Sequence, residues 1–249
     1  KKALAIYKSL GEVGPFSKNT DIIVVGLSLQ IDKNFIDKMP ELKVIASPTT
    51  GLNHIDVVYA KKRGIKVISL RGRKSFLKQI PSTAEETFAL LLCVARKIPW
   101  AFDYVKKGGW DRLKWRGHQL FGKTLGLLGF GRLGRIVSRY GRAFGMKVIS
   151  SDPNVSGSYM ARMGVRKVSP EKLFRESDFV SLHVLLTDDT HNLVKEKHLK
   201  TMKRTAYLIN TARAELIEKG ALEKALKNKW IAGAAVDVMW DERGDGSHL

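Results

Sequence analysis

"LLGFGRLGRI", residues 127–136, carries the clearest indication of the fold class of this chain. Gly129, Gly131 and Gly134 stand there in G-x-G-x-x-G order, directly after a strand-like apolar run and at the start of a helical pattern. The first glycine permits a tight turn, the second lets the backbone approach a diphosphate, and the third lets the helix pack close to the strand. The amino terminus of such a helix presents unpaired amides and a partial positive charge to a phosphate. The stretch therefore predicts a dinucleotide-binding strand–turn–helix unit.

The strand that follows this loop strengthens the prediction. Residues 146–152 end in Asp152, at the spacing from the glycines where a carboxylate binds ribose hydroxyls. The alternative interpretation makes Asp152 a plain turn residue before Pro153. Because an acidic group repels a 2′-phosphate, and no arginine directly follows Asp152, NAD is favoured over NADP as the cofactor. We expect the loop residues Arg132 and Leu133 to belong to the same cofactor site.

Short apolar runs alternate with helical patterns along the 249 residues, which indicates an α/β fold with parallel sheets. The strands predicted from these runs are residues 21–26, 42–48, 65–70, 124–131, 146–152, 179–184, 206–212 and 231–238. The last five are almost continuously apolar, which is typical of a sheet covered on both faces.

Two domains are predicted from this pattern. Residues 1–98 form a smaller, flavodoxin-like α/β substrate domain, and residues 99–249 form a doubly wound, Rossmann-type NAD-binding domain. We expect the first domain to be incomplete, because the chain opens on a helical pattern with no strand before it. A long helix near the boundary is expected to begin with a capping box, formed by Ser82 and Glu85.

The charge balance is unusual, with 44 basic against 24 acidic residues, a net charge of +20 and a pI near 10.0. The basic residues occur in pairs and triplets on helical patterns, without a long basic block. This distribution favours a solvated surface that gathers small anions, with nucleic-acid binding as the alternative. No apolar run approaches the ~20 residues of a membrane span, and the single Cys93 lies in an apolar run. We expect a cytoplasmic protein without a metal site.

Several longer stretches resemble, in order and spacing, the D-isomer-specific 2-hydroxyacid dehydrogenases, and the phosphoglycerate dehydrogenase-like members most closely. They are "GKTLGLLGFGRLGRIVSRYGRAFGMKVISSDP" (122–153), "SLHVLLTDDTHNLV" (181–194), "LINTARAELIEKGALEKAL" (208–226), "IAGAAVDV" (231–238), "SPTTGLNHIDVVYAKKRGIKV" (47–67) and "STAEETFALLLCVARKIP" (82–99). The resemblance implies reversible hydride transfer between nicotinamide and C2 of a D-2-hydroxy acid or 2-oxo acid, in a cleft between two domains.

Within this resemblance, Arg213 matches the substrate arginine, whose guanidinium binds a carboxylate and polarises the 2-oxo group. Glu242 matches the acid that raises the pKa of a catalytic histidine. The alternatives without a catalytic role are that Arg213 is a surface arginine and that Glu242 is a solvated acid in a loop. The family's histidine lies beyond Glu242, and none of the histidines here replaces it convincingly. We therefore expect that the sequence is cut before the catalytic acid.

The resemblance assigns further residues to the two ligands. The cofactor residues are His183, Val184, Thr211, Ala212 and Asp237, and the substrate-carboxylate loop contains Thr49, Thr50 and Gly51. Thr49 is a departure, because relatives commonly have glycine there. His54, after this loop, is interpreted as a local polar cap of the next helix.

The sequence leaves the identity of the substrate open. Net positive charge and the resemblance favour 3-phosphoglycerate, with glyoxylate, hydroxypyruvate and longer 2-oxo acids as alternatives. A homodimer is expected, with the aromatic arm Trp100–Trp115 as a contact. The competing function is a catalytically silent NAD-binding regulator or scaffold.

Overall fold

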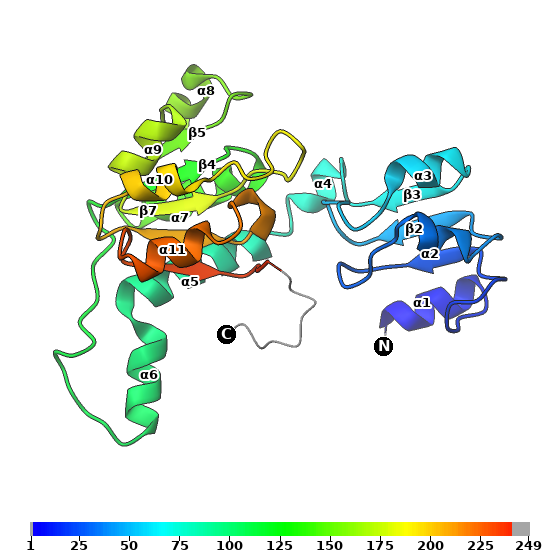
Figure 1. The fold of residues 1–249 in the computed structure, drawn as a ribbon, viewed down its shortest axis with the longest axis horizontal. Helices are drawn as coiled ribbons and strands as arrows, with labels where there is room; N and C mark the ends of the chain where they lie inside the picture. Colours follow the sequence, from blue (N-terminus) through cyan, green and yellow to red (C-terminus); the bar gives the residue numbers. More distant parts are fainter. Residues whose placement is uncertain (1, 241–249) are drawn as a thin grey trace. The chain divides into compact units, whose positions relative to one another are not determined.

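The computed structural model describes residues 2–240 and divides the chain into two compact units, Lys1–Leu77 and Lys78–Leu249 (Figure 1). Each unit contains one sheet in which all paired strands are parallel. The α/β fold class and the Rossmann-type arrangement predicted from the sequence are confirmed. Within residues 2–240, no helix combines the length and the apolar character that crossing a membrane requires.

The boundary between the units differs from the one expected after residue 98. Helix α5 (Ser82–Arg96) packs against two helices and two strands of the second unit, so it lies with that unit. Its buried side chains include Phe88 and Leu91, which join the core of the second unit. The expected capping box is wrong. The residue before the helix is Pro81, without a side-chain cap, and Ser82 is already inside the first turn.

The first unit is a three-stranded sheet of order β1-β2-β3 with four helices. Its elements are α1 (Lys2–Leu10), β1 (Ile22–Val24), α2 (Lys33–Asp37), β2 (Val44–Ser47), α3 (Val57–Lys62), β3 (Lys66–Ser69) and α4 (Lys74–Leu77). Ile45, on the central strand, is completely buried together with Ile36 of α2. Asp56, and not His54, caps α3, because its carboxylate accepts the amide of Tyr59 at 2.8 Å.

The second unit is a six-stranded sheet of order β6-β5-β4-β7-β8-β9. Its strands are β4 (Thr124–Leu128), β5 (Lys147–Ser151), β6 (Arg166–Lys167), β7 (Phe179–Leu182), β8 (Tyr207–Asn210) and β9 (Gly233–Val236). Besides α5, its helices are α6 (Ile98–Lys106), α7 (Arg132–Ala143), α8 (Gly157–Arg162), α9 (Pro170–Glu176), α10 (Glu196–Thr201), the 3-10 turn η1 (Ala214–Leu216) and α11 (Ala221–Lys227). The chain runs from β4 to one edge of the sheet and then returns to build the other half. This is the doubly wound arrangement.

Both faces of this sheet are covered, as the continuous apolar strands predicted. One buried cluster joins Leu125 and Leu127 of β4 to Phe88 and Val137 of helices α5 and α7. A second cluster joins the opposite face to α9, α10 and α11. The site described next therefore lies at the edge where the strands end.

Candidate functional site

The carboxyl ends of β4, β5 and β7 lie side by side, because β4 is central and pairs with both neighbours. The amide of Gly129 donates to Ser151 O at 2.9 Å, and the amide of His183 donates to Leu128 O at 2.7 Å. These bonds align the residues that follow the three strands, including Asp152. Since the chain direction across the sheet reverses at β4, this edge is the topological switch point where doubly wound proteins bind ligands.

The glycine loop has the shape that a diphosphate requires. Gly129 adopts φ +97°, and a Cβ on it would lie 2.6 Å from His183 O. A Cβ on Gly134 would collide with Gly129 O, which brings α7 close to the loop. In contrast, within the described residues no atom beyond the chain neighbours of Gly131, directly before α7, lies within 4 Å of its Cβ position. Open space in front of a helix amino terminus fits the diphosphate of NAD.

Asp152 is held at both carboxylate oxygens. Oδ2 accepts the amide of Phe130 at 2.8 Å, and Oδ1 accepts the amide of Asn154 at 2.8 Å. A carboxylate offers about four lone-pair positions, so each oxygen keeps capacity for a ribose hydroxyl. Asp152 therefore orders the turn after β5 and also suits the adenosine end of NAD.

The two other predicted loop residues contribute differently. Arg132 Nη1 donates to Ile80 O at 2.7 Å, and burial lowers the pKa of this guanidinium below its usual value. The side chain thus ties the start of α7 to the segment before α5. Leu133 is partly buried against the core. We assign to both residues a role in shaping the loop.

His183 is half-buried behind the glycine loop. Its Nε2 lies 2.9 Å from Ser181 Oγ, and burial lowers the pKa of the imidazole to about 4. The ring is therefore neutral at physiological pH and is not poised to donate a proton there. Val184, next in the chain, packs against the second core cluster.

The turn after β8 is organised by Asn210, whose importance the sequence analysis missed. Asn210 is completely buried, its Nδ2 donates to Arg213 O at 2.9 Å, and its Oδ1 accepts the amide of Ala212 at 3.0 Å. Arg213 Nη1 donates to Ala212 O at 2.7 Å. Among residues 2–240 this carbonyl is the one hydrogen-bond acceptor of the guanidinium. Its remaining N–H groups suit a carboxylate or a carbonyl oxygen.

Thr211 points its hydroxyl toward α5. Thr87 Oγ1 donates to Thr83 O at 2.7 Å and lies 2.7 Å from Thr211 Oγ1. Because the single proton of Thr87 is used, Thr211 donates to Thr87. The Thr211 hydroxyl is therefore engaged within the protein, and its role in the cofactor site stays a prediction.

Two further predicted residues lie near the end of the described chain. Asp237 follows β9, its amide donates to Asn210 O at 3.0 Å, and its side chain is exposed. Its role beside the nicotinamide stays a prediction. Glu242 lies outside the described residues.

The predicted substrate loop follows β2 in the first unit. Within the described residues, the amides of Thr50 and Gly51 have no hydrogen-bond acceptor. The Thr49 hydroxyl is hydrogen-bonded within the loop, because its Oγ1 donates to Gly51 O at 2.7 Å. Amides without an acceptor can hydrogen-bond an anion such as a carboxylate. Ser47 and His54, both buried, also join this loop, and the sequence analysis had not singled out Ser47 and had interpreted His54 as a helix cap.

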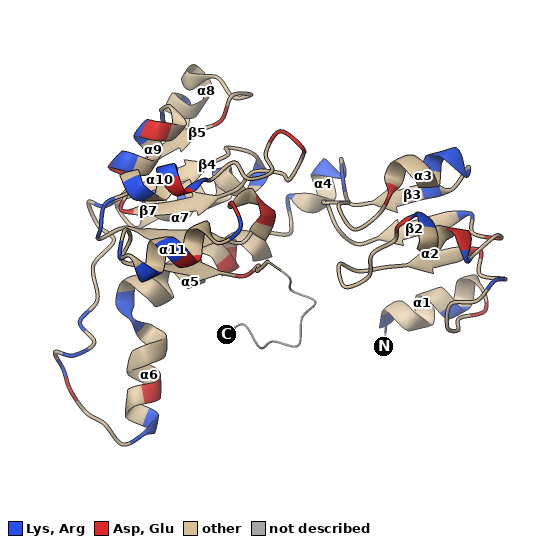
Figure 2. Ribbon diagram, viewed as in Figure 1, with Lys and Arg blue, Asp and Glu red and all other residues tan. Residues whose placement is uncertain are grey.

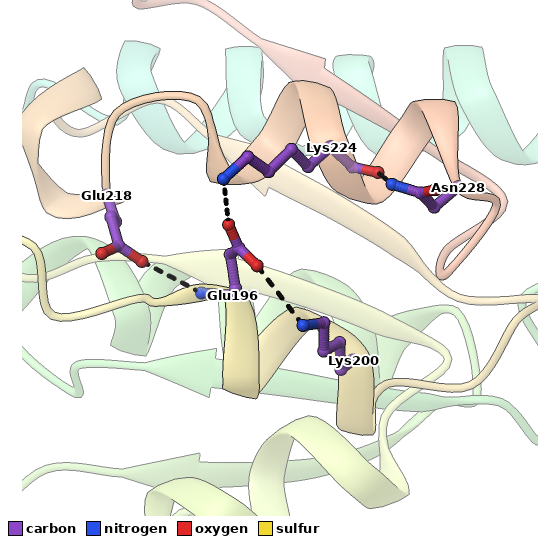
Figure 3. A network of polar contacts seen from close by, with 5 residues as sticks. All are labelled: Glu196, Lys200, Glu218, Lys224 and Asn228. Atoms are coloured by element: carbon purple, nitrogen blue, oxygen red, sulfur yellow. Dashed lines mark hydrogen bonds and ion pairs between the residues drawn. The ribbon is translucent and has the colours of Figure 1, made fainter.

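Another polar network joins α10 to α11 (Figure 3). The Glu196 carboxylate accepts hydrogen bonds from Lys200 and from Lys224. Both contacts lower the pKa of this carboxylate, and the contact with Lys224 has the larger effect. Its amide donates to Glu218. The network is a cross-link between helices.

Two family models match the chain. "D-isomer specific 2-hydroxyacid dehydrogenase, NAD binding domain" matches residues 88–248, and "D-isomer specific 2-hydroxyacid dehydrogenase, catalytic domain" matches residues 9–75.

Individual proteins are similar over most of the chain. A glyoxylate reductase of Korarchaeum cryptofilum is 40% identical over 230 residues, which cover 90% of this chain and 68% of that protein. A D-3-phosphoglycerate dehydrogenase of Methanocaldococcus jannaschii is 38% identical over 226 residues, 90% of this chain and 42% of that protein. The crystal structure of D-lactate dehydrogenase from Aquifex aeolicus, complexed with NAD and lactic acid, superposes with a TM-score of 0.81 at 35% identity, over 91% of this chain and 67% of that one.

Proposed function

The chain belongs to the D-isomer specific 2-hydroxyacid dehydrogenase family, and from this membership we propose that it reduces a small 2-oxo acid, with glyoxylate as the first substrate to test. The family resemblance drawn from the sequence motifs is confirmed, and so is NAD as the cofactor. NAD, when bound, exchanges a hydride with C2 of the acid. The protein must bind the cofactor, hold the acid and polarise its 2-oxo group.

The observation that carries the proposal is the placement of Arg213. It follows β8 at the same sheet edge as the glycine loop, and Asn210 fixes the turn that carries it. A guanidinium there can hydrogen-bond a 2-oxo oxygen and stabilise the negative charge that develops on it during reduction. In the first unit, the free amides of Thr50 and Gly51 suit the carboxylate of a 2-oxo acid.

The test is oxidation of NADH by the purified protein with glyoxylate, hydroxypyruvate, pyruvate and 3-phosphohydroxypyruvate. We expect turnover of at least one acid, and a loss of about 100-fold or more in kcat/KM for Arg213→Ala, since charged donors at a reacting oxygen contribute on the order of 3 kcal/mol. Arg175→Ala is the matched control, because Arg175 is exposed on α9. Binding of NADH without turnover of any acid would instead support a silent NAD-binding regulator.

3-Phosphoglycerate is the second candidate substrate, and the charge beside the substrate loop favours it. The amide of Leu70 donates to Thr49 O at 3.0 Å, so the chain after β3 continues next to the loop. This segment holds Arg71, Arg73 and Lys74, all exposed, and no acidic residue. Figure 2 shows basic residues in blue at the start of α4. A kcat/KM for 3-phosphohydroxypyruvate above that for glyoxylate, which falls in Arg73→Ala, would select this candidate.

We further propose that the protein is a homodimer with the aromatic arm, residues 100–115, as a contact. Helix α6 buries none of its side chains, and Trp110 is 80% exposed. Large aromatic side chains are enriched at interfaces. Light scattering of the wild type and of Trp110→Ala measures the mass directly, and a wild-type monomer would refute the dimer.

A further inference from the structure

The substrate loop of the first unit contains a chain of hydrogen bonds between side chains. His54 Nε2 lies 3.2 Å from Ser47 Oγ, Ser47 Oγ lies 2.9 Å from Thr49 Oγ1, and Thr49 Oγ1 lies 2.7 Å from Gly51 O. Ser47 and His54 are each only 4% exposed. Buried hydrogen bonds of this kind restrict a loop to one conformation, because each broken contact leaves a desolvated polar group.

Which group donates in each of these hydrogen bonds follows from counting the available protons. A carbonyl only accepts, so the single hydroxyl proton of Thr49 goes to Gly51 O. Thr49 Oγ1 must then accept from Ser47, and Ser47 Oγ must accept from His54 Nε2–H. His54 is a donor to Ser47 and not a base that activates it. This pair is therefore not arranged as a nucleophile and its general base.

The hydrogen bonds of this loop engage two of its carbonyls and leave two of its amides without an acceptor. Gly51 O is occupied by Thr49, and Thr49 O is occupied by the amide of Leu70 at 3.0 Å. The amides of Thr50 and Gly51 are left without an acceptor within the described residues. An anion-binding pair of amides is most effective when it is already in place before the ligand arrives.

We propose that Ser47, Thr49 and His54 are positioning residues that preorganise the Thr50 and Gly51 amides for the substrate carboxylate. They act through the main chain. The inference rests on the proposed function for the identity of the anion, but the ordering of the loop is a property of the protein alone. The hydroxyl of Thr49 is central, because it joins Ser47 to the Gly51 carbonyl.

The experiment compares Thr49→Val, which removes the hydroxyl at nearly constant shape, with Thr49→Ser, which retains it. The loss of the two part-buried hydrogen bonds of the Thr49 hydroxyl predicts a KM for glyoxylate about 5- to 10-fold higher in the valine variant, with kcat changed by less than about twofold. The dissociation constant of NADH should stay unchanged, and the serine variant should restore the KM. Thr205→Val is the matched control, because Thr205 is exposed in the second unit.

Two readouts do not depend on turnover. Amide hydrogen exchange of residues 50–52 should be faster in Thr49→Val and Ser47→Ala than in the wild type and Thr49→Ser. Calorimetric titration of the NADH-loaded protein with oxamate, an unreactive 2-oxo acid analogue, should show weaker binding in the same two variants.

The outcomes separate the two ideas. A wild type that turns over no 2-oxo acid overturns the proposed function, and faster exchange in the variants would still support the ordering of the loop. An active wild type with an unchanged KM and unchanged exchange in Thr49→Val overturns the positioning role. A rise in KM that is matched by equally large decreases in kcat and in NADH affinity would also overturn it, because such a pattern indicates general damage to the fold.

Discussion

The amide of Phe130, inside the glycine loop, donates a hydrogen bond to Asp152 Oδ2 at 2.8 Å. This contact joins the turn after β4 to the residue that follows β5. The Asp152 side chain therefore fixes the position of the glycine loop, and its carboxylate oxygens keep lone pairs that can accept from a ligand. Cofactor affinity and cofactor choice should both depend on it.

Asp152→Asn tests this dual role. Asparagine can still accept from Phe130, but it removes the negative charge that disfavours a 2′-phosphate. We expect the KM for NADH to rise about 10-fold, and the ratio of NADPH to NADH efficiency to rise by a similar factor. Steady-state kinetics with both cofactors measure it. Asp188→Asn, on an exposed residue, is the control, and an unaltered cofactor ratio in Asp152→Asn would contradict the assignment.

Gly129 and Gly131 should respond to alanine in opposite ways. At Gly129, the positive φ and the approach of His183 O predict a loss of folding stability of about 2 kcal/mol or more. At Gly131, the Cβ meets no atom of the described residues beyond its chain neighbours, so the variant should fold normally. That methyl group projects into the space assigned to the diphosphate, so NADH binding should weaken at least 10-fold. Thermal unfolding and fluorescence titration separate the two effects, and normal NADH affinity in Gly131→Ala would refute the assignment.

The glycine loop, the parallel sheets and most strands were predictable because their causes are local. A run such as residues 206–212 is apolar throughout, and a covered parallel strand requires nothing more. Strand β6 was missed because its two residues, Arg166 and Lys167, are exposed and basic. Helix α6 has Pro99 in its first turn. Proline is tolerated in a first turn, where its missing N–H has no intrahelical partner anyway.

The side-chain hydrogen bonds of the site could not be predicted in the same way. The contact between Thr87 and Thr211 joins residues 124 positions apart, and neither residue type signals a partner. Asn210 did carry a local signal, since an asparagine at a strand end commonly bonds the backbone two residues later.

Stability at mildly acidic pH should depend on His183. Its pKa is lowered from 6.5 to about 4 in the folded protein, so the unfolded chain binds a proton between these pH values and the folded protein does not. The free energy of unfolding therefore decreases as pH falls from 6.5 to 4, by on the order of 2 kcal/mol for this half-buried ring, and the contribution is complete above pH 6.5. Denaturant unfolding across this range should show a smaller decrease in His183→Gln. His118→Gln is the control, and identical pH profiles of wild type and His183→Gln would disprove the contribution.

The pair Thr87 and Thr211 fixes the turn that carries Arg213 against α5, and a double-mutant cycle can measure it. Thr87→Val leaves the buried Thr211 hydroxyl without its acceptor and should cost about 1–3 kcal/mol. Adding Thr211→Val removes the stranded hydroxyl, so the double variant should be more stable than the sum of the single changes predicts. If the contact also positions Arg213, Thr87→Val should lower kcat for the 2-oxo acid more than it weakens NADH binding. Additive single effects in denaturant unfolding would show instead that the two hydroxyls are not coupled.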